Sequence, residues 1–347
     1  MRALLLIVLF KSITLDSFAQ LPEFFSYDRN GIALNQENPT LFKVFRGSIE
    51  SLHLANKAQT LGGSFIRSAN SIRFKPLVPF DWDTNYTILY QESLYSFSIK
   101  IPEDYERLEV VSVYPNAKEV PSNILKWYVS FSKPINSTNV YNHFKIMDSD
   151  GLEINRAILD LNSPLLSKDG QLLTIWIEPG RQKRDLGPNQ QLGSVFKANN
   201  DYILQILQSL KDVNGVTMET HFEHHFKTTA ADRKKPQLSN WSITIPKAQT
   251  KESLRIHCTD IIDYGSLINH TVILKDGNPI QGNVYFNYDN NTIIFKSLKL
   301  WNKGYYTVLF NSKLEDISGN NLKRLFDEDS QNNSQEDYLT SLNFTID

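Results

Sequence analysis

The stretch SIRFKPLVPFDWDTNYTILYQ, Ser71 to Gln91, decides the fold because the same order of parts returns twice later in the chain. An alternating apolar segment with Ile72 and Phe74 comes first, a polar turn follows, and a second alternating segment begins at Tyr86. Side chains on a strand point alternately to opposite faces, so a period of two predicts strands with one buried face. This stretch therefore predicts two strands joined by a turn.

Two further copies follow the same plan. One is TIIFKSLKLWNKGYYTVLFNSKLEDISGNN, Thr292 to Asn321, and the other runs from Leu173 to Val216 and carries an insertion. A tyrosine leads the second strand of each copy, at Tyr86, Tyr202 and Tyr306, and we expect it to form a tyrosine corner with the upstream backbone. Short closing strands are expected at residues 95–99, 222–228 and 342–346. The copies recur at roughly 110 residues, which is the size of one immunoglobulin-like sandwich.

The repeat predicts an all-β protein built from tandem immunoglobulin-like β-sandwich domains. We place these domains at residues 20–104, 105–232 and 233–347, because the second junction is polar and ends in a proline. The 20 Phe and 15 Tyr residues favour strands. Only a turn or two of helix is expected, at residues 137–144 and 269–274. We expect such stacked modules to leave no cleft for chemistry.

Residues 1–19 indicate a cleavable signal peptide. Arg2 supplies the positive charge, the apolar run from Ala3 to Phe10 is too short to cross a membrane, and Ser17 and Ala19 are small residues before the expected cleavage site. We therefore expect a protein that is secreted, periplasmic or displayed on a bacterial cell surface, with no membrane span after signal removal. Cys258 is the one cysteine, so no intramolecular disulfide is available.

The middle copy resembles the bacterial Ig-like domain of the S-layer (SbsA) type, best at residues 106–230. The resemblance is carried by Pro115, by Val120-Pro121, by the motif Phe131-Ser132-Lys133-Pro134-Ile135, by the turn from Asp148 to Gly151, and by the closing segments from Leu173 to Ile206 and from Leu210 to Gly215. The third domain departs from the pattern, because His257-Cys258-Thr259-Asp260 replaces the F-S-x-P motif. The resemblance implies stalk, spacer or display modules of exported proteins, without a shared active site.

One cluster has the residue types of a metal site, His221 to His225. On a strand, His221, Glu223 and His225 share one face, and zinc accepts such nitrogen and oxygen ligands. Three side chains in one row stand about 6–7 Å apart and rarely converge on one ion, so a solvent-facing polar row is the other interpretation. We predict no metal and no cofactor.

The insertion Gly180 to Asn189 holds three cations in four positions, at residues 181, 183 and 184. It suits either an anion- or partner-binding loop or a solvated excursion between strands. The acidic turns at residues 148–151 and 276–278 lack the closing Glu of a calcium loop, so they indicate hairpin turns.

Other catalytic patterns are weak. Cys258 and His257 are adjacent on a strand and point to opposite faces, which favours a buried structural thiol over a nucleophile. The five tryptophans could either stack against a sugar or lie in the cores; they are Trp82, Trp127, Trp176, Trp241 and Trp301. A net charge of −2 without a long basic stretch argues against nucleic-acid binding.

We therefore predict a non-enzymatic, exported multi-Ig protein with a structural, adhesive or ligand-presenting role at the bacterial envelope. No catalytic, cofactor-binding or metal-binding residue is assigned, and the expected partner is a protein or glycan of the envelope. The alternatives are a carbohydrate-binding accessory protein and a metal-dependent hydrolase centred on His221 to His225.

Overall fold

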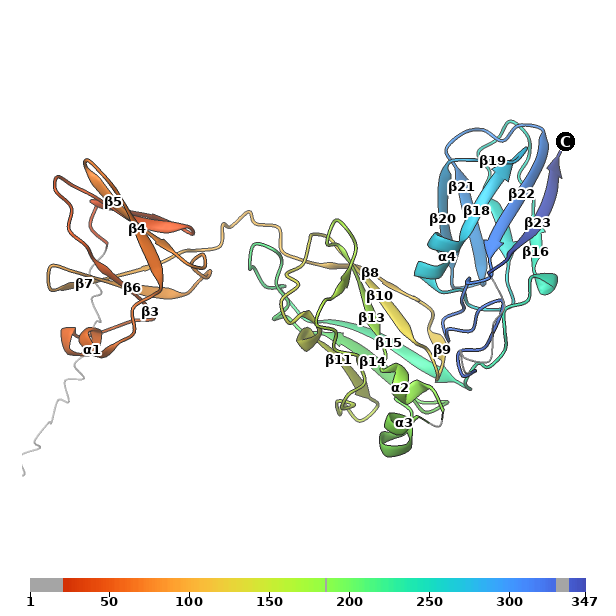
Figure 1. The fold of residues 1–347 in the computed structure, drawn as a ribbon, viewed down its shortest axis with the longest axis horizontal. Helices are drawn as coiled ribbons and strands as arrows, with labels where there is room; N and C mark the ends of the chain where they lie inside the picture. The colour runs from red at the N-terminus through yellow and green to blue at the C-terminus, as the bar shows by residue number, and fades with distance from the viewer. Residues whose placement is uncertain (1–20, 185, 329–336) are drawn as a thin grey trace, which may run out of the picture. The chain divides into compact units, whose positions relative to one another are not determined.

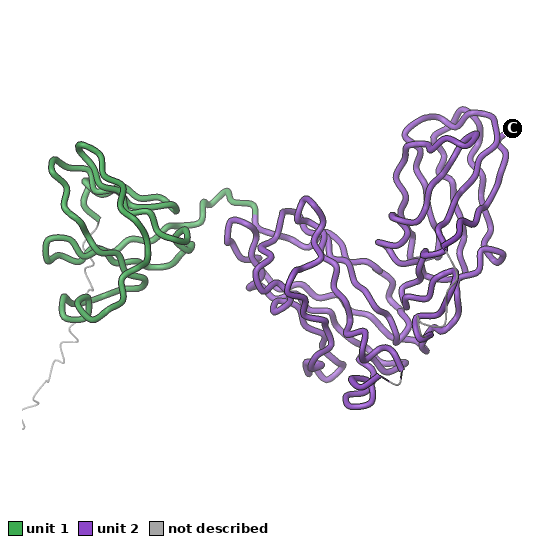
Figure 2. The backbone as a smooth tube through the Cα atoms, viewed as in Figure 1, with its two compact units in different colours: residues 1–106 green, residues 107–347 purple. Residues whose placement is uncertain are grey.

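The computed structural model describes residues 21–184, 186–328 and 337–347. The chain divides into two compact units, residues 1–106 and 107–347, which we call unit 1 and unit 2 (Figure 2). The predicted signal peptide, residues 1–19, lies outside the described residues. Within the described part, none of the helices has both the length and the apolarity that crossing a membrane requires.

Unit 1 is a sandwich of two sheets with one helix, α1 (Leu52–Lys57). The first sheet has the order β1-β2-β5-β4 and is formed by Phe25–Asp28, Gly31–Asn35, Ser71–Pro76 and Gly63–Ser68. The second sheet has the order β3-β6-β7 and is formed by Lys43–Arg46, Asn85–Tyr90 and Ser93–Ser98. Ile32 and Phe74 of the first sheet share a buried core with Ile88 and Phe97 of the second. The predicted alternation from Ile72 to Phe74 therefore sets the inner face of β5.

Unit 2 begins with a sandwich that we call the middle sandwich (Figure 1). One sheet has the order β12-β13-β10-β8 and contains Leu165–Leu166, Leu172–Trp176, Lys126–Phe131 and Val110–Tyr114. The other has the order β11-β14-β15-β9 and contains Phe144–Asp148, Asp201–Ile206, Phe222–Thr229 and Glu119–Pro121. All these pairings are antiparallel except that β15 pairs with β9 in parallel.

The C-terminal sandwich of unit 2 has the same plan, except that the extra strand of its second sheet, β19, lies at the opposite edge from β9. One sheet has the order β16-β17-β21-β20 and contains Ser242–Thr244, Leu254–His257, Thr292–Ser297 and Gly282–Asn287. The other has the order β19-β18-β22-β23 and contains Asn278–Pro279, Thr271–Lys275, Gly304–Asn311 and Leu339–Ile346. Read as strands A to G, each of the three sandwiches has an A-B-E-D sheet facing a C-F-G sheet, which is the immunoglobulin arrangement. The chain is an all-β protein of tandem immunoglobulin-like sandwiches, as the sequence predicts.

The three predicted tyrosine corners are present. The hydroxyl of Tyr86 accepts a hydrogen bond from Asp81 N at 2.8 Å, and that of Tyr202 accepts one from Lys197 N at 2.9 Å. Tyr306 donates its hydroxyl proton to Asn302 O at 2.8 Å. Each tyrosine therefore ties the start of strand F to the turn before it.

Helices are short and lie at loops, in part where the sequence does not predict them. The helix expected at residues 269–274 is misplaced, because α4 covers Tyr264–His270 and strand β18 begins at Thr271. The 3-10 helix η1 covers Val140–His143, within the expected range of 137–144. Two further helices, α2 (Pro179–Gln182) and α3 (Gly187–Leu192), lie in the insertion, and η2 covers Leu238–Asn240. Prolines stand in the first turns of α2 and α3, where a missing backbone N–H costs nothing. Each of these prolines therefore favours the start of a helix. These helices are not predicted from the sequence, because the prediction follows the pattern of repeated strands.

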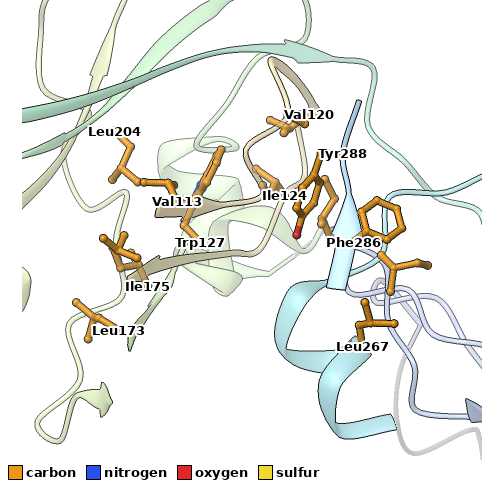
Figure 3. Packing of buried hydrophobic residues seen from close by; sticks show 14 of the residues in the cluster. Val113, Val120, Ile124, Trp127, Leu173, Ile175, Leu204, Leu267, Phe286 and Tyr288 are labelled. Atoms are coloured by element: carbon orange, nitrogen blue, oxygen red, sulfur yellow. The ribbon is translucent and has the colours of Figure 1, made fainter. Parts of the chain in front are cut away.

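A single apolar cluster runs through both sandwiches of unit 2. It includes Ile124 of the middle sandwich and Leu267, Phe286 and Tyr288 of the C-terminal sandwich (Figure 3). The backbone joins them as well, because Leu125 N donates to Ile317 O at 3.0 Å. The two sandwiches therefore pack on each other within one unit.

Candidate functional site

A hollow in unit 2 lies where its two sandwiches meet, and β10 and β13 form its floor. Period-two alternation buries Trp127 and Ile175 in the middle sandwich. The same alternation places Lys126, Tyr128 and Trp176 on the opposite face of the sheet, where they line the hollow. Strand geometry therefore supplies a floor of one cation and two aromatic rings. We call this hollow the junction cleft.

The C-terminal sandwich provides the walls of the junction cleft. Helix α4 contributes Ser266, Asn269 and His270, and its start is fixed because the carboxylate of Asp263 accepts from Ser266 N at 2.8 Å. The segments around β22 and β23 contribute the remaining polar lining, Lys313, Glu315, Asn321, Lys323, Arg324 and Asp337. The volume is about 610 Å³, within the range of small-molecule sites. This cleft corrects the expectation that the stacked sandwiches leave none.

Charged groups cross the base of the cleft. Lys126 Nζ lies 2.7 Å from Glu315 Oε2 and 3.8 Å from Asp263 Oδ1. Tyr128 donates its hydroxyl proton to Asp263 Oδ1 at 2.8 Å. Asp263 and Lys126 are both buried, so each depends on these partners for its polar contacts. The cluster therefore joins the two sandwiches and cannot be supplied by either one alone.

Burial and charge shift the pKa values of these groups. Burial raises the pKa of the Asp263 carboxyl, and the nearby Lys126 and the donors Ser266 N and Tyr128 only partly oppose it. Burial acts to lower the pKa of Lys126, but Asp263 and Glu315 outweigh it and raise that pKa. Burial first, and then Asp263, raises the pKa of Tyr128. The lysine therefore keeps its proton and the tyrosine stays a hydrogen-bond donor.

Aromatic rings complete the junction beside the cleft. Tyr114 of β8 stacks on Tyr264 of α4, with ring centroids 4.3 Å apart and an interplanar angle of 3°. Tyr128 meets the same Tyr264 ring at 5.4 Å. Gly265 is the residue after Tyr264 in the sequence, and a Cβ atom at this position would lie 2.6 Å from the Tyr128 hydroxyl oxygen. The absence of a side chain at this position therefore allows the close approach of α4 to the sheet.

The candidate metal-binding row, His221 to His225, does not form a closed site. His221 Nε2, just before β15, and His225 Nε2, on β15, stand 3.4 and 3.3 Å from the two carboxylate oxygens of Glu223. His224 lies on the other face of β15 against Trp127 and Phe226. Burial lowers its pKa to about 4. In the described part of the chain, no group of three or more His, Cys, Asp or Glu side chains is arranged to hold a metal ion.

The insertion at residues 180–189 uses all three of its cations within the fold, and Lys183 Nζ donates to Glu328 O at 3.5 Å. Arg181 is buried, and its guanidinium donates to the carbonyls of Asn155, Gly193 and Ser194 at 2.8–3.1 Å. Arg184 Nε lies 3.0 Å from Asp327 Oδ2. The excursion is therefore buried at Arg181 and exposed at residues 184, 186 and 187, and an anion-binding role loses its central cation, Arg181.

The acidic turns at residues 148–151 and 276–278 are hairpin turns, and Cys258 is a structural thiol. The Asp148 carboxylate accepts from the backbone N–H groups of Asp150 and Leu152, as a hairpin turn requires. Asp276 has a φ of 49° and Gly277 one of 80°, which also fits a hairpin turn. Burial raises the pKa of the Cys258 thiol, so the reactive thiolate is disfavoured.

Most tryptophans are core residues. Trp127, Trp241 and Trp301 are at most 7 % exposed, so they offer no platform to a sugar ring. Trp82 lies in unit 1 with the Arg29 guanidinium over its ring. Trp176 alone among the five lines the junction cleft, and Lys126 Nζ lies 4.8 Å from its ring centroid.

Sequence reasoning missed the cleft, although one signal for it was present. In the segment LKWYV, Lys126 and Tyr128 flank the core residue Trp127, so the alternation places a cation and a phenol together on an outer face. Their partners Asp263 and Glu315 lie far away in the sequence, and no periodicity links them.

Comparisons with known proteins leave the family open. No protein-family model and no curated protein matches this chain. Among solved structures, the titin I9-I11 tandem covers 80 % of this chain and 87 % of its own at 11 % identity, with a TM-score of 0.23. The N-terminal part of the bacterial S-layer protein SbsC covers 58 % and 40 % at 14 % identity and a TM-score of 0.25. Domains 3–5 of the Drosophila OTK extracellular region cover 95 % and 99 % at 10 % identity and a TM-score of 0.19. At these scores, the fold assignment rests on the strand order of the chain itself.

Proposed function

We propose that this chain is an exported, non-catalytic multi-Ig protein that acts as a spacer or display module at the bacterial envelope. The observation that carries the proposal is the bonded junction of unit 2. Lys126 and Glu315 meet at 2.7 Å, and Leu125 N donates to Ile317 O. Such a junction keeps two sandwiches at one spacing, which suits presentation of a surface better than substrate turnover.

The assignment of the parts follows from the same proposal. We infer a signal peptide at residues 1–19 and three domains at 20–104, 105–232 and 233–347, of which the second is of the SbsA type. The motif Phe131 to Ile135 supports the family assignment, because it forms the end of β10 and the turn after it, and Ile135 bridges to Asp212 in the closing segment from Leu210 to Gly215. In the third domain Ile262 bridges to Asp316 in the same way, which supports a shared plan.

Export and fractionation test the proposal directly. The full chain with a C-terminal tag is expressed in a bacterial host, and the tagged protein is followed through cytosolic, periplasmic, envelope and medium fractions. We expect it outside the cytosol, with a mass that lacks residues 1–19. Retention in the cytosol at full mass contradicts the proposal.

A second candidate function is carbohydrate binding, and the junction cleft favours it. Trp176, which is only partly buried, places aromatic surface beside the hydroxyl- and amide-bearing residues Thr174, Ser266 and Asn269. Aromatic surface edged by hydrogen-bonding groups is the usual composition of a concave ligand site. The metal-dependent hydrolase receives no such support at His221 to His225.

A further inference from the structure

The junction cleft is lined by side chains of both charges, and most of them are paired. Lys126 is held by Glu315, and Asp337 lies between Lys313 and Lys323 with contacts of 2.6 and 2.9 Å. The opposite charges within each of these groups largely cancel. The net charge of the cleft is therefore small, and the polar and charged side chains outside these pairs decide which ligand binds.

Arg324 is the cation that these pairs leave out. Its backbone N–H donates to Asn321 Oδ1, but no carboxylate of the described residues lies within 4.0 Å of its guanidinium. The side chain is half-buried at the cleft and carries five N–H donors in a planar fork. A carboxylate or a phosphate binds this fork in two-point contact. Because one cation is left over, the single charge of a carboxylate matches the cleft better than the nearly double charge of a phosphate monoester.

Three further polar groups line the cleft without a side-chain partner among the described residues. They are the hydroxyl of Thr174, the indole N–H of Trp176 and the imidazole of His270. Asn269 adds an amide whose nitrogen donates to Gly265 O at 2.8 Å, which leaves its carbonyl oxygen for an incoming hydroxyl. Hydroxyl groups both donate and accept, so a polyhydroxylated ligand matches this mixture better than an apolar one.

We propose that the junction cleft binds an acidic saccharide, with the carboxylate of a uronic-acid residue at Arg324 and a sugar ring beside Trp176. This inference rests on the second candidate function and is independent of the spacer role. The volume of about 610 Å³ accommodates a short oligosaccharide, and both sandwiches of unit 2 contribute to it. An acidic peptide offers carboxylates as well, but it lacks the hydroxyl groups that the remaining lining residues match.

Isothermal titration calorimetry with the full chain tests the proposal. The probes are trigalacturonate, the neutral galactotriose and the peptide tri-aspartate. We expect trigalacturonate to bind, galactotriose to bind at least about tenfold more weakly, and tri-aspartate not to bind. Absence of trigalacturonate binding, equal binding of the neutral sugar, or preferential binding of tri-aspartate each overturns the proposal.

Two variants locate the site. Arg324→Gln is expected to weaken trigalacturonate binding by about tenfold, because it removes a charge-assisted contact. The matched control is Arg255→Gln, since Arg255 is an exposed arginine of β17 outside the cleft lining.

Trp176→Phe, which keeps an aromatic ring, is expected to weaken binding of both sugars, with Trp82→Phe in unit 1 as its control. Thermal unfolding of each variant verifies folding, and unchanged affinity in folded Arg324→Gln protein refutes the assignment. Fractionation of the wild-type chain reports on the spacer role separately.

Discussion

The hydroxyl of Tyr128 donates to Asp263 Oδ1 at 2.8 Å, and this bond links the outer face of the middle sandwich to the N-terminus of helix α4 in the C-terminal sandwich. Asp263 is at the same time the cap of α4, through Ser266 N. One carboxylate therefore fixes a helix start and the contact between two sandwiches. Stability of the junction and shape of the cleft depend on the same atoms.

Removal of the Tyr128 hydroxyl is the first test of this link. In Tyr128→Phe, Asp263 loses one of its donors while it stays buried, so we expect a loss of about 1–3 kcal/mol in the free energy of unfolding of unit 2. Urea denaturation followed by circular dichroism measures it. Tyr305→Phe is the matched control, because Tyr305 is 51 % exposed. Equal stability of Tyr128→Phe and wild type would show that the bond contributes nothing.

A pH prediction follows from His224. Its pKa falls from 6.5 in the unfolded chain to about 4 in the fold, because it is buried against Trp127 and lies near the charge of His225. Below pH 6.5 the unfolded chain binds a proton at His224 that the folded chain does not bind. The free energy of unfolding therefore has its full value, as far as His224 is concerned, above pH 6.5. It decreases as the pH falls from 6.5 towards 4, by up to about 3 kcal/mol.

The variant His224→Phe isolates this effect from the carboxyl groups, whose titration both proteins share. Its free energy of unfolding is expected to exceed that of wild type by a margin that grows between pH 6.5 and 4, measured by urea denaturation at each pH. Phenylalanine suits the site because His224 Nε2 is buried without a hydrogen-bond partner in the described structure. A margin that stays constant over this range would contradict the assignment.

Gly319 tests how closely the Leu125 side chain of the middle sandwich packs on the C-terminal sandwich. A Cβ at this position would lie 2.3 Å from Leu125 Cδ1, and its φ is +79°. Gly277 has nearly the same φ of +80° but nothing within 4 Å of its Cβ position, so it is a matched control. Both alanine variants share the cost of a left-handed backbone, but Gly319→Ala adds a clash. We expect it to lose about 1–3 kcal/mol more than Gly277→Ala in urea denaturation, and equal losses would place Leu125 elsewhere.

Trp301→Ala tests the core assignment of a residue that the sequence left open between core and sugar platform. Trp301 is 1 % exposed and its indole N–H donates to Glu252 O at 2.7 Å. Truncation leaves a cavity, so we expect a loss of about 3–5 kcal/mol in the stability of the C-terminal sandwich. Thermal unfolding measures the loss. A stable variant with weakened sugar binding would favour the platform instead.

Local alternation decides much of the fold, and the sequence shows it openly. Tyr86, Tyr202 and Tyr306 recur at the same place in a repeated pattern, so their corners are predictable without coordinates. The same reasoning correctly places His224 and His225 on opposite faces of one strand, because a period of two leaves no other choice. Strand content, strand faces and the number of sandwiches all follow from this short-range regularity.

Partners that lie far apart in the chain escape such reasoning. Arg181 has the appearance of a solvated loop cation in the sequence, yet its guanidinium donates to five backbone carbonyls in the fold. Lys126 and Glu315 are 189 residues apart, and no repeat relates them. Alternation states which face a side chain occupies, but only the packing of one sandwich on another determines what lies opposite that face. The sequence by itself therefore determined the sandwiches, and tertiary structure alone decided their junction and the cleft within it.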